Sequence, residues 1–492
     1  MLVPSPGALR RARRRRWAPG GTPPSRKPSS VNEPRSSEPA TPAEAGATNG
    51  SGGVVGTLRT ALPEGTFALG GGLIVAAITA YVFVIVVQNK LGTREWAGFS
   101  AFWALVFVVG PGLFLPIEQE VSRAIAARRA QGLGGGPLVS RAARLAGGLL
   151  VVTIVAITAV ELLGGGVISD NLFHGEQGLV WALEFGLVGF FTMHLTRGVL
   201  SGNGRFGPYG VMMAAEGTFR LLGAIGLAVA GVEMAGLYGA CIGGASFIAV
   251  AVALAMARPR TLVADGPPAP YSELSTALAW LLVGSVFMQL LGYTPLLGVN
   301  LLESGTDKAA AAAFASAFFI ARIPVLLFQA VQGTLLPKLA GLAGAGRAKD
   351  FRDGLLRLLV VVVGIAVLGT IGALVLGPFA GRILFKDFSM SASNLALLAA
   401  GSGAFIVALT IAQALIAVNA YTRVAFSWVA GVVVFLVVCA GIDDLFLRVE
   451  LGFLAGAGAS CALMLLQLRS AMARGLSADR LLEAFEHEPL EL

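Results

Sequence analysis

The sequence predicts an all-α polytopic membrane protein of about twelve transmembrane helices, in two six-helix lobes related by a pseudo-twofold axis along the membrane normal. Composition is the first reason, because 55% of the residues are hydrophobic and only 13% are charged. Soluble domains carry about 25% charged residues. A series of long apolar segments is the second reason, and an internal repeat is the third.

Twelve apolar segments are long enough to cross a bilayer, which takes about 20 helical residues. We predict spans near 66–88, 96–117, 143–164, 178–197, 209–230, 234–257, 276–301, 309–335, 356–380, 391–417, 424–441 and 449–468. All three cysteines, Cys241, Cys439 and Cys461, fall inside these segments, which argues against a framework of extracellular disulfides.

Residues 1–60 differ from the rest and predict a disordered, basic cytoplasmic tail. The run "RRARRRRW" is followed by Pro, Ser, Thr, Ala and Gly in no periodic order, so the tail cannot bury enough apolar surface to fold. No apolar segment of about 7–15 residues follows the arginines, unlike in a secretory signal. The arginines either attract anionic lipid, at about 1 kcal/mol per charge, or keep the tail solvated.

The charges of the loops predict the orientation. On the side of the N-terminal tail, the segments between spans and the C-terminal tail hold eighteen Lys and Arg residues. The opposite side holds six: Lys90, Arg94, Lys308, Arg382, Lys386 and Arg448. Cytoplasmic loops carry the excess of positive charge, so both termini are predicted to be cytoplasmic.

The chain repeats itself. "LGTREWAGFSAFWALVFVVGPGLF" follows the first predicted span, and "SGTDKAAAAAFASAFFIARIPVLL" follows the seventh. An offset of 213 or 216 residues relates four pairs: Gly92 and Gly305, Pro111 and Pro324, Asn203 and Asn419, and Gly236 and Gly452. A nearly constant offset indicates duplication of a six-span unit. We predict lobes at 61–257 and 276–470, a Pro-rich cytoplasmic linker at 258–275 and a cytoplasmic C-terminal tail at 471–492.

Prolines and carboxylates meet at the end of the second span, in "PGLFLPIEQEVSR". Pro111, Pro116 and, in the second copy, Pro324 each remove a helix hydrogen bond, so we predict hinges there. Glu118 and Glu120 are predicted to act in coupling or gating. The alternative is that they lie at headgroup level and pair locally, Glu120 with Arg123.

Arg220, Arg322, Glu184 and Glu216 fall inside predicted spans, where a charge costs about 2.5–3.5 kcal/mol and usually faces a cavity or a partner. Arg220 and Arg322 are predicted to bind substrate, because a guanidinium suits a diphosphate. The alternative for Arg322 is bonding to backbone carbonyls that Pro324 leaves free. Glu216 lies one turn before Arg220 and either pairs with it or takes part in coupling. Glu184 has no evident partner in the sequence and is predicted to carry a coupling ion, with the alternative that it reaches the membrane interface from the outer end of its span.

The remaining polar residues predict binding at the seam between the lobes or plain helix packing. Gln329 and Gln332 are predicted to contact substrate. A polar seam that binds hydroxyl groups is predicted from these two and from Gln88, Gln289, Tyr293, Asn300, Gln413 and Asn419, with interhelical hydrogen bonding as the alternative. His194 and Arg197, in "FTMHLTRG", are placed at the membrane interface. Three histidines without partners at ligand spacing predict no metal site.

Several motifs make the chain similar to a known superfamily: "LGTREWAGFSAF", "EQEVSRAIAARRAQG" and "PVLLFQAVQGTLLPKLA". Over about residues 60–475 it resembles the multidrug/oligosaccharidyl-lipid/polysaccharide (MOP) exporters, and among them the polysaccharide-biosynthesis flippases. The resemblance implies two lobes around a central cavity that opens alternately to each side. It implies transport of a polyprenyl-diphosphate-linked glycan across the bacterial plasma (inner) membrane, with cavity cations holding the diphosphate.

The resemblance also implies the partners, which are the lipid bilayer, the lipid-linked glycan and glycan-synthesis enzymes, but no nucleic acid. No cofactor is expected beyond a coupling proton or sodium ion. A cation-coupled multidrug exporter is the main alternative, which Glu184, Glu216 and Glu118 keep open. A membrane glycosyltransferase, polymerase or acyltransferase ranks low, because the longest outer loop, 161–178, holds a single histidine. A scaffold subunit without transport activity also remains an alternative.

Overall fold

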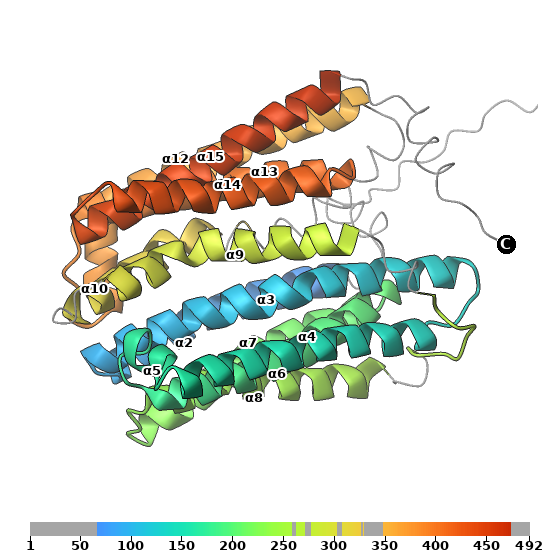
Figure 1. Cartoon of the computed structure of the whole chain (residues 1–492), viewed down its shortest axis with the longest axis horizontal. Coiled ribbons are helices and arrows are strands. Elements are labelled where there is room, and N and C mark those ends of the chain that lie inside the picture. Colours follow the sequence, from blue (N-terminus) through green and yellow to red (C-terminus); the bar gives the residue numbers. More distant parts are fainter. Residues whose placement is uncertain are drawn as a thin grey trace, which may run out of the picture. The chain divides into compact units, whose positions relative to one another are not determined.

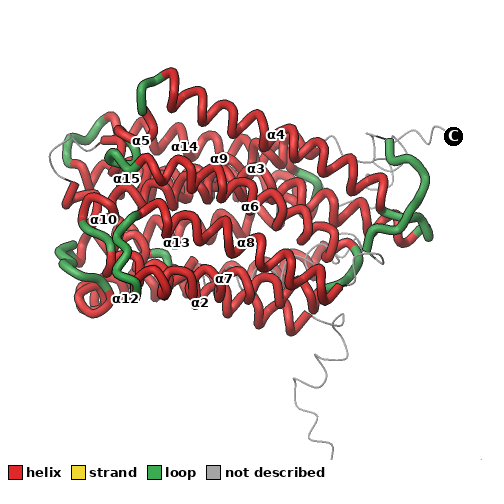
Figure 2. The backbone as a smooth tube through the Cα atoms, turned by 90° about the horizontal axis from the view of Figure 1, so that it is seen from below, coloured by secondary structure: helices red, strands yellow, loops and turns green. Residues whose placement is uncertain are grey.

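The computed structural model describes residues 66–257, 262–270, 277–302, 308–325, 328 and 348–473. Throughout these residues the regular secondary structure is helical, with no strand (Figure 2). The predicted N-terminal tail and residues 474–492 of the predicted C-terminal tail lie outside the described residues.

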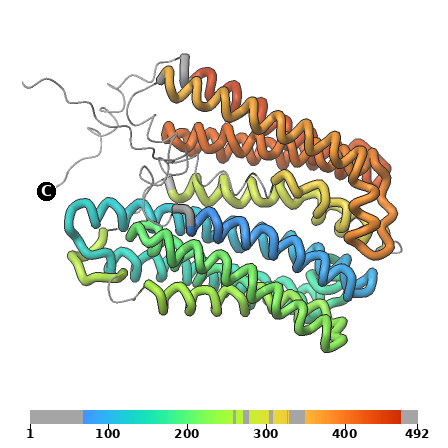
Figure 3. Tube along the Cα trace, turned by 180° about the vertical axis from the view of Figure 1, so that it is seen from behind, coloured from blue at the N-terminus to red at the C-terminus, as the bar shows by residue number. Residues whose placement is uncertain are grey.

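Seven helices belong to the first copy of the repeat (Figure 1): α2 Thr66–Lys90, α3 Thr93–Ala130, α4 Gly136–Leu163, α5 Val167–Asn171, α6 Gln177–Gly202, α7 Phe206–Val229 and α8 Ala235–Ala257. In the second copy, the described helices are α9 Ala277–Leu302, α10 Lys308–Ala321, α12 Ala348–Leu384, α13 Ala392–Ala417, α14 Tyr421–Ala440 and α15 Leu445–Ala473. Figure 3 shows the two copies as separate groups, from blue to green and from yellow to red.

Eleven helices within the described residues are long and apolar enough to span a membrane. Each coincides with one predicted span. The remaining predicted span, 309–335, is represented by α10 and by the apolar helical stretch Ala309–Val325; of its later residues only Phe328 is described. The all-α, multi-pass architecture predicted from the sequence is confirmed.

The same helix packing occurs in both lobes. In the first, α2 packs on α7, α6 and α7 on α8, α3 on α6, and α4 on α3 and α6. In the second, α9 packs on α14, α13 and α14 on α15, α10 on α13, and α12 on α10 and α13. Because these pairs correspond one to one, the duplication read from the offset of about 215 residues is also a duplication of packing.

Many apolar side chains point outward, above all on the peripheral helices α4 and α12. Val152 and Val155 of α4 are exposed, as are Leu368, Val375 and Phe379 of α12. A soluble helix would place polar residues there, whereas a lipid-facing helix has no reason to. These faces therefore belong in the hydrocarbon layer.

The two lobes meet mainly where α3 packs on α9, with a smaller contact between α3 and α10. Polar side chains bridge the lobes near the ends of α2 and α9. The Trp96 indole N–H donates to the Ala312 carbonyl at 3.0 Å, and Asn300 of α9 donates to Ser100 of α3 at 3.2 Å. We call this the far end, and the opposite end, beside residues 262–270, the linker end.

Two local expectations were wrong about where helices end. We predicted the second span to end at 117, but α3 continues without a break through Pro111 and Pro116 to Ala130. Glu118 and Glu120 therefore lie within a helix. The predicted outer loop 161–178 contains the short helix α5, whose first N–H groups, at Ile168 and Ser169, donate to the buried Glu161 carboxylate.

Candidate functional site

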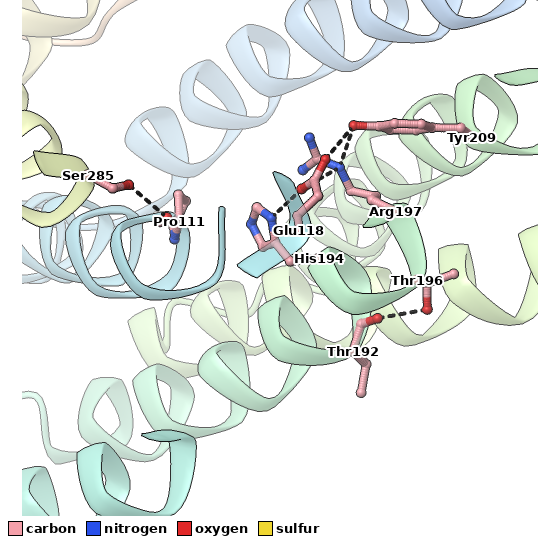
Figure 4. Close-up of polar contacts among 8 residues, drawn as sticks. All are labelled: Pro111, Glu118, Thr192, His194, Thr196, Arg197, Tyr209 and Ser285. Carbon is pink, nitrogen blue, oxygen red and sulfur yellow. Dashed lines mark hydrogen bonds and ion pairs between the residues drawn. The ribbon is translucent and has the colours of Figure 1, made fainter. Parts of the chain in front are cut away.

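Four polar residues, three of them buried and Arg197 largely enclosed, meet in the first lobe, and we call them the N-lobe network: Glu118 of α3, His194 and Arg197 of α6, and Tyr209 of α7 (Figure 4). The Glu118 carboxylate lies 2.7 Å from His194 Nδ1 and accepts from the Tyr209 hydroxyl at 2.8 Å. Arg197 Nε lies 3.3 Å from the same carboxylate and donates to the Tyr209 oxygen at 2.9 Å. His194 Nε2 is buried and has no hydrogen-bond partner in the described part of the chain.

Helix geometry and two glycines build this network. His194 and Arg197 are three residues apart and so lie on one face of α6. Gly198 and Gly202 let that face approach α3 closely: a Cβ at Gly198 would stand 2.8 Å from the Glu118 carbonyl oxygen, and one at Gly202 would stand 2.7 Å from Ile125 Cβ. The backbone contact brings the Glu118 carboxylate within reach of both α6 side chains.

The structure encloses the side chains of His194 and Arg197, which the sequence analysis placed at the membrane interface, between neighbouring helices. His194 is 3% exposed, and Arg197 is largely enclosed. Their spacing on one helix face was a signal in the sequence, but nothing in it showed which carboxylate they would meet. Glu120, two residues further along α3, instead pairs with Arg123, whose Nε donates at 3.2 Å, as the local alternative predicted.

A second buried pair lies on α7. Arg220 donates to Glu216 at 2.7 Å, which confirms the predicted pairing one turn apart. Its guanidinium lies 5.5 Å from the Phe83 ring centre and 5.9 Å from that of Trp103, a distance at which a cation is attracted to an aromatic face. Glu216 also acts electrostatically on Arg197, which links this pair to the N-lobe network.

Arg322 lies in the second lobe, directly after α10. It is 9% exposed and donates to the carbonyl oxygen of Gly292 in α9. Its guanidinium lies 4.9 Å from the Tyr293 ring centre and 5.0 Å from that of Phe318. The sequence prediction offered carbonyls freed by Pro324 as its partners, whereas the partner belongs to α9.

A proline that the sequence analysis did not single out explains the local structure of α9. Pro295 lies inside this helix and has no N–H to give to the Leu291 carbonyl. The Thr294 hydroxyl donates to that carbonyl instead, at 2.8 Å. The Gly292 carbonyl, one residue further on, accepts from Arg322, so this guanidinium is anchored beside a proline-disturbed turn.

Aromatic rings connect the two arginines across the boundary between the lobes. We call Trp103, Phe107, Tyr293, Phe318 and Phe319 the aromatic layer. Trp103 and Phe107 of α3 have ring centres 4.7 Å apart, and Phe107 stacks on Tyr293 of α9 at 6.2 Å. Tyr293 contacts Phe318, and Trp103 contacts Phe319. Arg220 contacts this layer at Trp103 and Arg322 contacts it at Tyr293, so the two cations reach the aromatic layer from opposite lobes.

A small pocket of about 60 Å³ lies near the linker end between α3, α9, α13 and α14. Its walls are mostly apolar and include Trp280, with Gln119, Ser285, Gln413 and Tyr421 as polar members. Ser285 also donates to the Pro111 carbonyl at 3.4 Å across the lobe boundary (Figure 4). Neither Arg220 nor Arg322 lines this pocket; both lie against the aromatic layer.

The polar seam predicted from the sequence lies at the lobe boundary, but its described members mostly tie the lobes together. Gln289 donates to the Phe107 carbonyl and Gln88 to the Lys386 carbonyl, each at 3.0 Å. Gln413 lines the pocket, and Asn419 ends the turn after α13 with a positive φ of 57°. Gln329 and Gln332 lie outside the described residues.

Two further predicted residues, Glu184 and Pro324, contact neighbouring helices of their own lobes. Glu184 was expected to be isolated, which was wrong, because the Thr158 hydroxyl of α4 donates to it at 2.6 Å. Pro324 packs on α12, where a Cβ at Gly369 would stand 2.7 Å from the proline ring. Among the described residues, no cluster of three or more His, Cys, Asp or Glu side chains could hold a metal ion.

Comparison with known proteins identifies the fold. No protein-family profile matches the chain. An uncharacterized protein of Mycobacterium tuberculosis (strain ATCC 25618 / H37Rv) is 24% identical over 404 residues, which cover 79% of this chain and 89% of that protein. A protein of Mycobacterium bovis, also uncharacterized, matches equally well.

Solved structures of multidrug transporters are similar over most of the chain. A mutant of a Vibrio cholerae MATE transporter superposes with a TM-score of 0.60 at 17% identity, covering 82% of this chain and 95% of that one. An inward-facing MATE family transporter of the MOP superfamily gives 0.61 at 15% identity, covering 81% and 95%. An outward-facing one also gives 0.61 at 15%, covering 83% and 94%. The chain is thus a multi-pass membrane protein with the two-lobed fold of the MATE transporters.

Proposed function

We propose that this protein is a transporter of the MOP superfamily that flips a polyprenyl-diphosphate-linked glycan by alternating access, for glycan synthesis at the cell envelope. One observation carries the proposal: two arginines, one from each lobe, are buried against a shared aromatic layer in the middle of the lobe boundary. Buried guanidinium groups are expensive in a membrane and are usually kept for a partner or a pathway.

The chemistry of a diphosphate fits this pair. A guanidinium donates two parallel N–H groups to a phosphate, which gives geometry as well as charge. Arg220 now has a carboxylate as its partner, and Arg322 a backbone carbonyl. Separation of the lobes would uncover both, and a diphosphate could replace these acceptors while the polyprenyl chain stays in lipid. Binding that favours the separated arrangement shifts the population toward it.

We place the coupling ion at Glu118 as a proton, which binds when the lobes separate and the hydrogen-bond donors move away, because these donors stabilise the ionised carboxylate in the arrangement seen here. The carboxylate is surrounded by an imidazole, a guanidinium and a phenol, which donate hydrogen bonds, whereas a hard cation needs several oxygen ligands. Glu118 also lies just after Pro116 on α3. Proteoliposomes with an imposed proton or sodium gradient test this: only the proton gradient should accelerate flipping, and Glu118→Gln should abolish that acceleration.

We place the protein in the bacterial plasma membrane with both termini in the cytoplasm, because of the excess of Lys and Arg on that side. A protease-protection assay on tagged termini in right-side-out and inverted vesicles tests the orientation.

The decisive experiment is a flipping assay. The protein is reconstituted with a fluorescent polyprenyl-diphosphate sugar, and dithionite quenching follows the rate at which the headgroup crosses. We expect Arg322→Gln and the double variant Glu216→Gln/Arg220→Gln, which leaves no buried carboxylate unpaired, to lower the rate at least about tenfold (about 1.4 kcal/mol). Arg382→Gln, which changes an exposed arginine at the far end of α12, is the control. Folded arginine variants that flip at the wild-type rate would refute the role of this pair.

A cation-coupled multidrug exporter is the second candidate, and the apolar pocket with Trp280 favours it. Solved transporters with this fold include multidrug transporters. In cells depleted of the protein, lipid-linked sugar should accumulate on the inner leaflet if the first proposal is right. Unchanged lipid-linked sugar together with new sensitivity to cationic dyes would favour the exporter.

A further inference from the structure

Glu450 on α15 is a buried carboxylate without a partner among the described residues. The residue is 1% exposed, and neither Oε1 nor Oε2 has a hydrogen-bond partner there. The other buried glutamates of the described residues each have at least one: Glu118 in the N-lobe network, Glu120 with Arg123, Glu216 with Arg220, and Glu161 at the start of α5. Glu450 differs from all of them.

Its neighbours on α15 show that apolar helices enclose this part of the second lobe. A Cβ at Gly298 of α9 would stand 3.4 Å from Val449, and one at Gly401 of α13 would stand 2.5 Å from Phe453. One at Gly452 would stand 3.0 Å from Phe435 of α14. An ionised carboxylate in such surroundings carries a large desolvation penalty, which the protein avoids by keeping the group neutral.

The charged and titratable groups nearby do not neutralise Glu450. Helix α13 carries none, and Tyr293, the titratable residue of α9, belongs to the aromatic layer. On α14, Cys439 donates to the Arg448 carbonyl. Arg448 itself donates to the Leu302 carbonyl of α9 at 2.9 Å. Asp444, directly before the same helix, is exposed and carries the same charge, so it cannot pair with Glu450.

We propose that Glu450 is a proton-binding site of the second lobe, separate from Glu118. The carboxylate takes one proton from hydronium and leaves water, and it holds that proton while α9, α13 and α14 enclose it. When these helices separate and water reaches the side chain, the proton leaves. A metal ion would need further ligands, and the described residues offer no cluster of acidic, His or Cys side chains here. The inference rests on the lobe packing and not on the substrate.

Linkage between protonation and stability tests the proposal on the full-length protein. If folded Glu450 keeps a proton that the unfolded chain releases, raising the pH above about 5 destabilises the wild type relative to Glu450→Gln. The ratio of their unfolding constants should change up to about tenfold per pH unit until folded Glu450 ionises. Thermal unfolding in detergent from about pH 5 to 9 measures this. The double variant Glu216→Gln/Arg220→Gln is the control: it removes a paired glutamate together with its partner, so its ratio to wild type should stay flat.

A labelling experiment on the wild-type protein stands beside the unfolding measurement. Dicyclohexylcarbodiimide is soluble in lipid and modifies protonated carboxyl groups in apolar surroundings. Peptide mass spectrometry should find the adduct on Glu450, decreasing as the pH rises, and none on Glu216. A flat stability ratio for Glu450→Gln overturns the proposal; if that variant does not fold, absence of the adduct at every pH does so. Neither result depends on whether the protein flips lipid-linked glycans.

Discussion

At the residue scale, several buried charges of the described residues are organised in groups. The N-lobe network joins a carboxylate to three donors from two other helices. Such groups are costly to assemble, and they become far more costly when one member is removed, because the remaining charge stays buried without its partner. The network therefore makes a sharp prediction about stability.

Glu118→Ala should lower the free energy of unfolding by about 3–5 kcal/mol, because Arg197 is left as a buried unpaired cation. Tyr209→Phe should cost only about 1–3 kcal/mol, because it leaves the ion pair in place. Unfolding in detergent measures both, with the exposed Asp353→Ala of α12 as a control that should stay within about 0.5 kcal/mol of wild type.

A double-mutant cycle decides whether these energies come from the pair itself. The double variant Glu118→Ala/Arg197→Ala removes both charges of the pair. Its free energy of unfolding should therefore fall by less than the sum of the decreases in the two single variants. Simple additivity would contradict the network.

Arg322 yields a second prediction at this scale. Arg322→Lys keeps the positive charge but loses the planar fork that donates to Gly292 and lies over Tyr293. We expect the flipping rate to fall at least about tenfold (about 1.4 kcal/mol) while the protein stays folded, and Arg382→Lys to leave the rate unchanged. A wild-type rate for Arg322→Lys would show that charge alone is sufficient.

At the scale of elements, close backbone contacts decide which side chains meet. Helix α6 reaches α3 only because Gly198 and Gly202 lack a Cβ. The same helices carry Ser122 and Ser201, whose hydroxyls lie 2.9 Å apart. The position of Glu118 is therefore a property of the α3–α6 pair and not of α3 alone.

Gly198→Ala should destabilise the protein by about 1–3 kcal/mol, because its Cβ would force α3 away from α6. Gly226→Ala in α7 is the matched control, since a Cβ there meets nothing within 4 Å. A glycine in the middle of a helix costs about 0.5–1 kcal/mol relative to alanine, so the control should be as stable as wild type or more stable. Equal effects of the two substitutions would contradict the close contact.

The two prolines of α3 yield another prediction for this element. Proline inside a helix removes one hydrogen bond and clashes with the preceding turn, at about 3 kcal/mol. If Pro116 serves as a hinge beside Glu118, Pro116→Ala should slow flipping at least about tenfold (about 1.4 kcal/mol) without lowering the unfolding temperature. If Pro116→Ala lowered both the unfolding temperature and the flipping rate, the role of Pro116 would be purely structural.

At the scale of the whole molecule, alternating access requires the α3–α9 contact to open. A Cβ at Gly112 of α3 would stand 3.3 Å from the Val286 Cα of α9, and one at Gly217 of α7 would stand 3.0 Å from the Ala76 Cα of α2. In a background without Cys241, Cys439 and Cys461, the double variant Gly112→Cys/Val286→Cys should form a disulfide that stops transport, and reduction of the disulfide should restore transport. The control Ala76→Cys/Gly217→Cys, within one lobe, should form a disulfide and leave the transport rate unchanged.

Composition, span positions and the duplication could be predicted from the sequence, because a bilayer demands about 20 apolar helical residues per span and the two copies keep their spacing. The pairing of Glu216 with Arg220 could be predicted too, since helical neighbours four residues apart meet by geometry. These features are local, or they repeat at a fixed period.

Only the tertiary structure decided which distant helices bring their polar groups together. Glu118 and His194 are 76 residues apart, and no periodicity relates α3 to α6. The partner of Glu184 is Thr158 of α4, and the partner of Arg322 is the Gly292 carbonyl beside the turn that Pro295 disturbs. Within the described residues, Glu450 was left without one because the helices around it supply only apolar contacts. Long-range packing sets these environments, and one-dimensional patterns do not encode it directly.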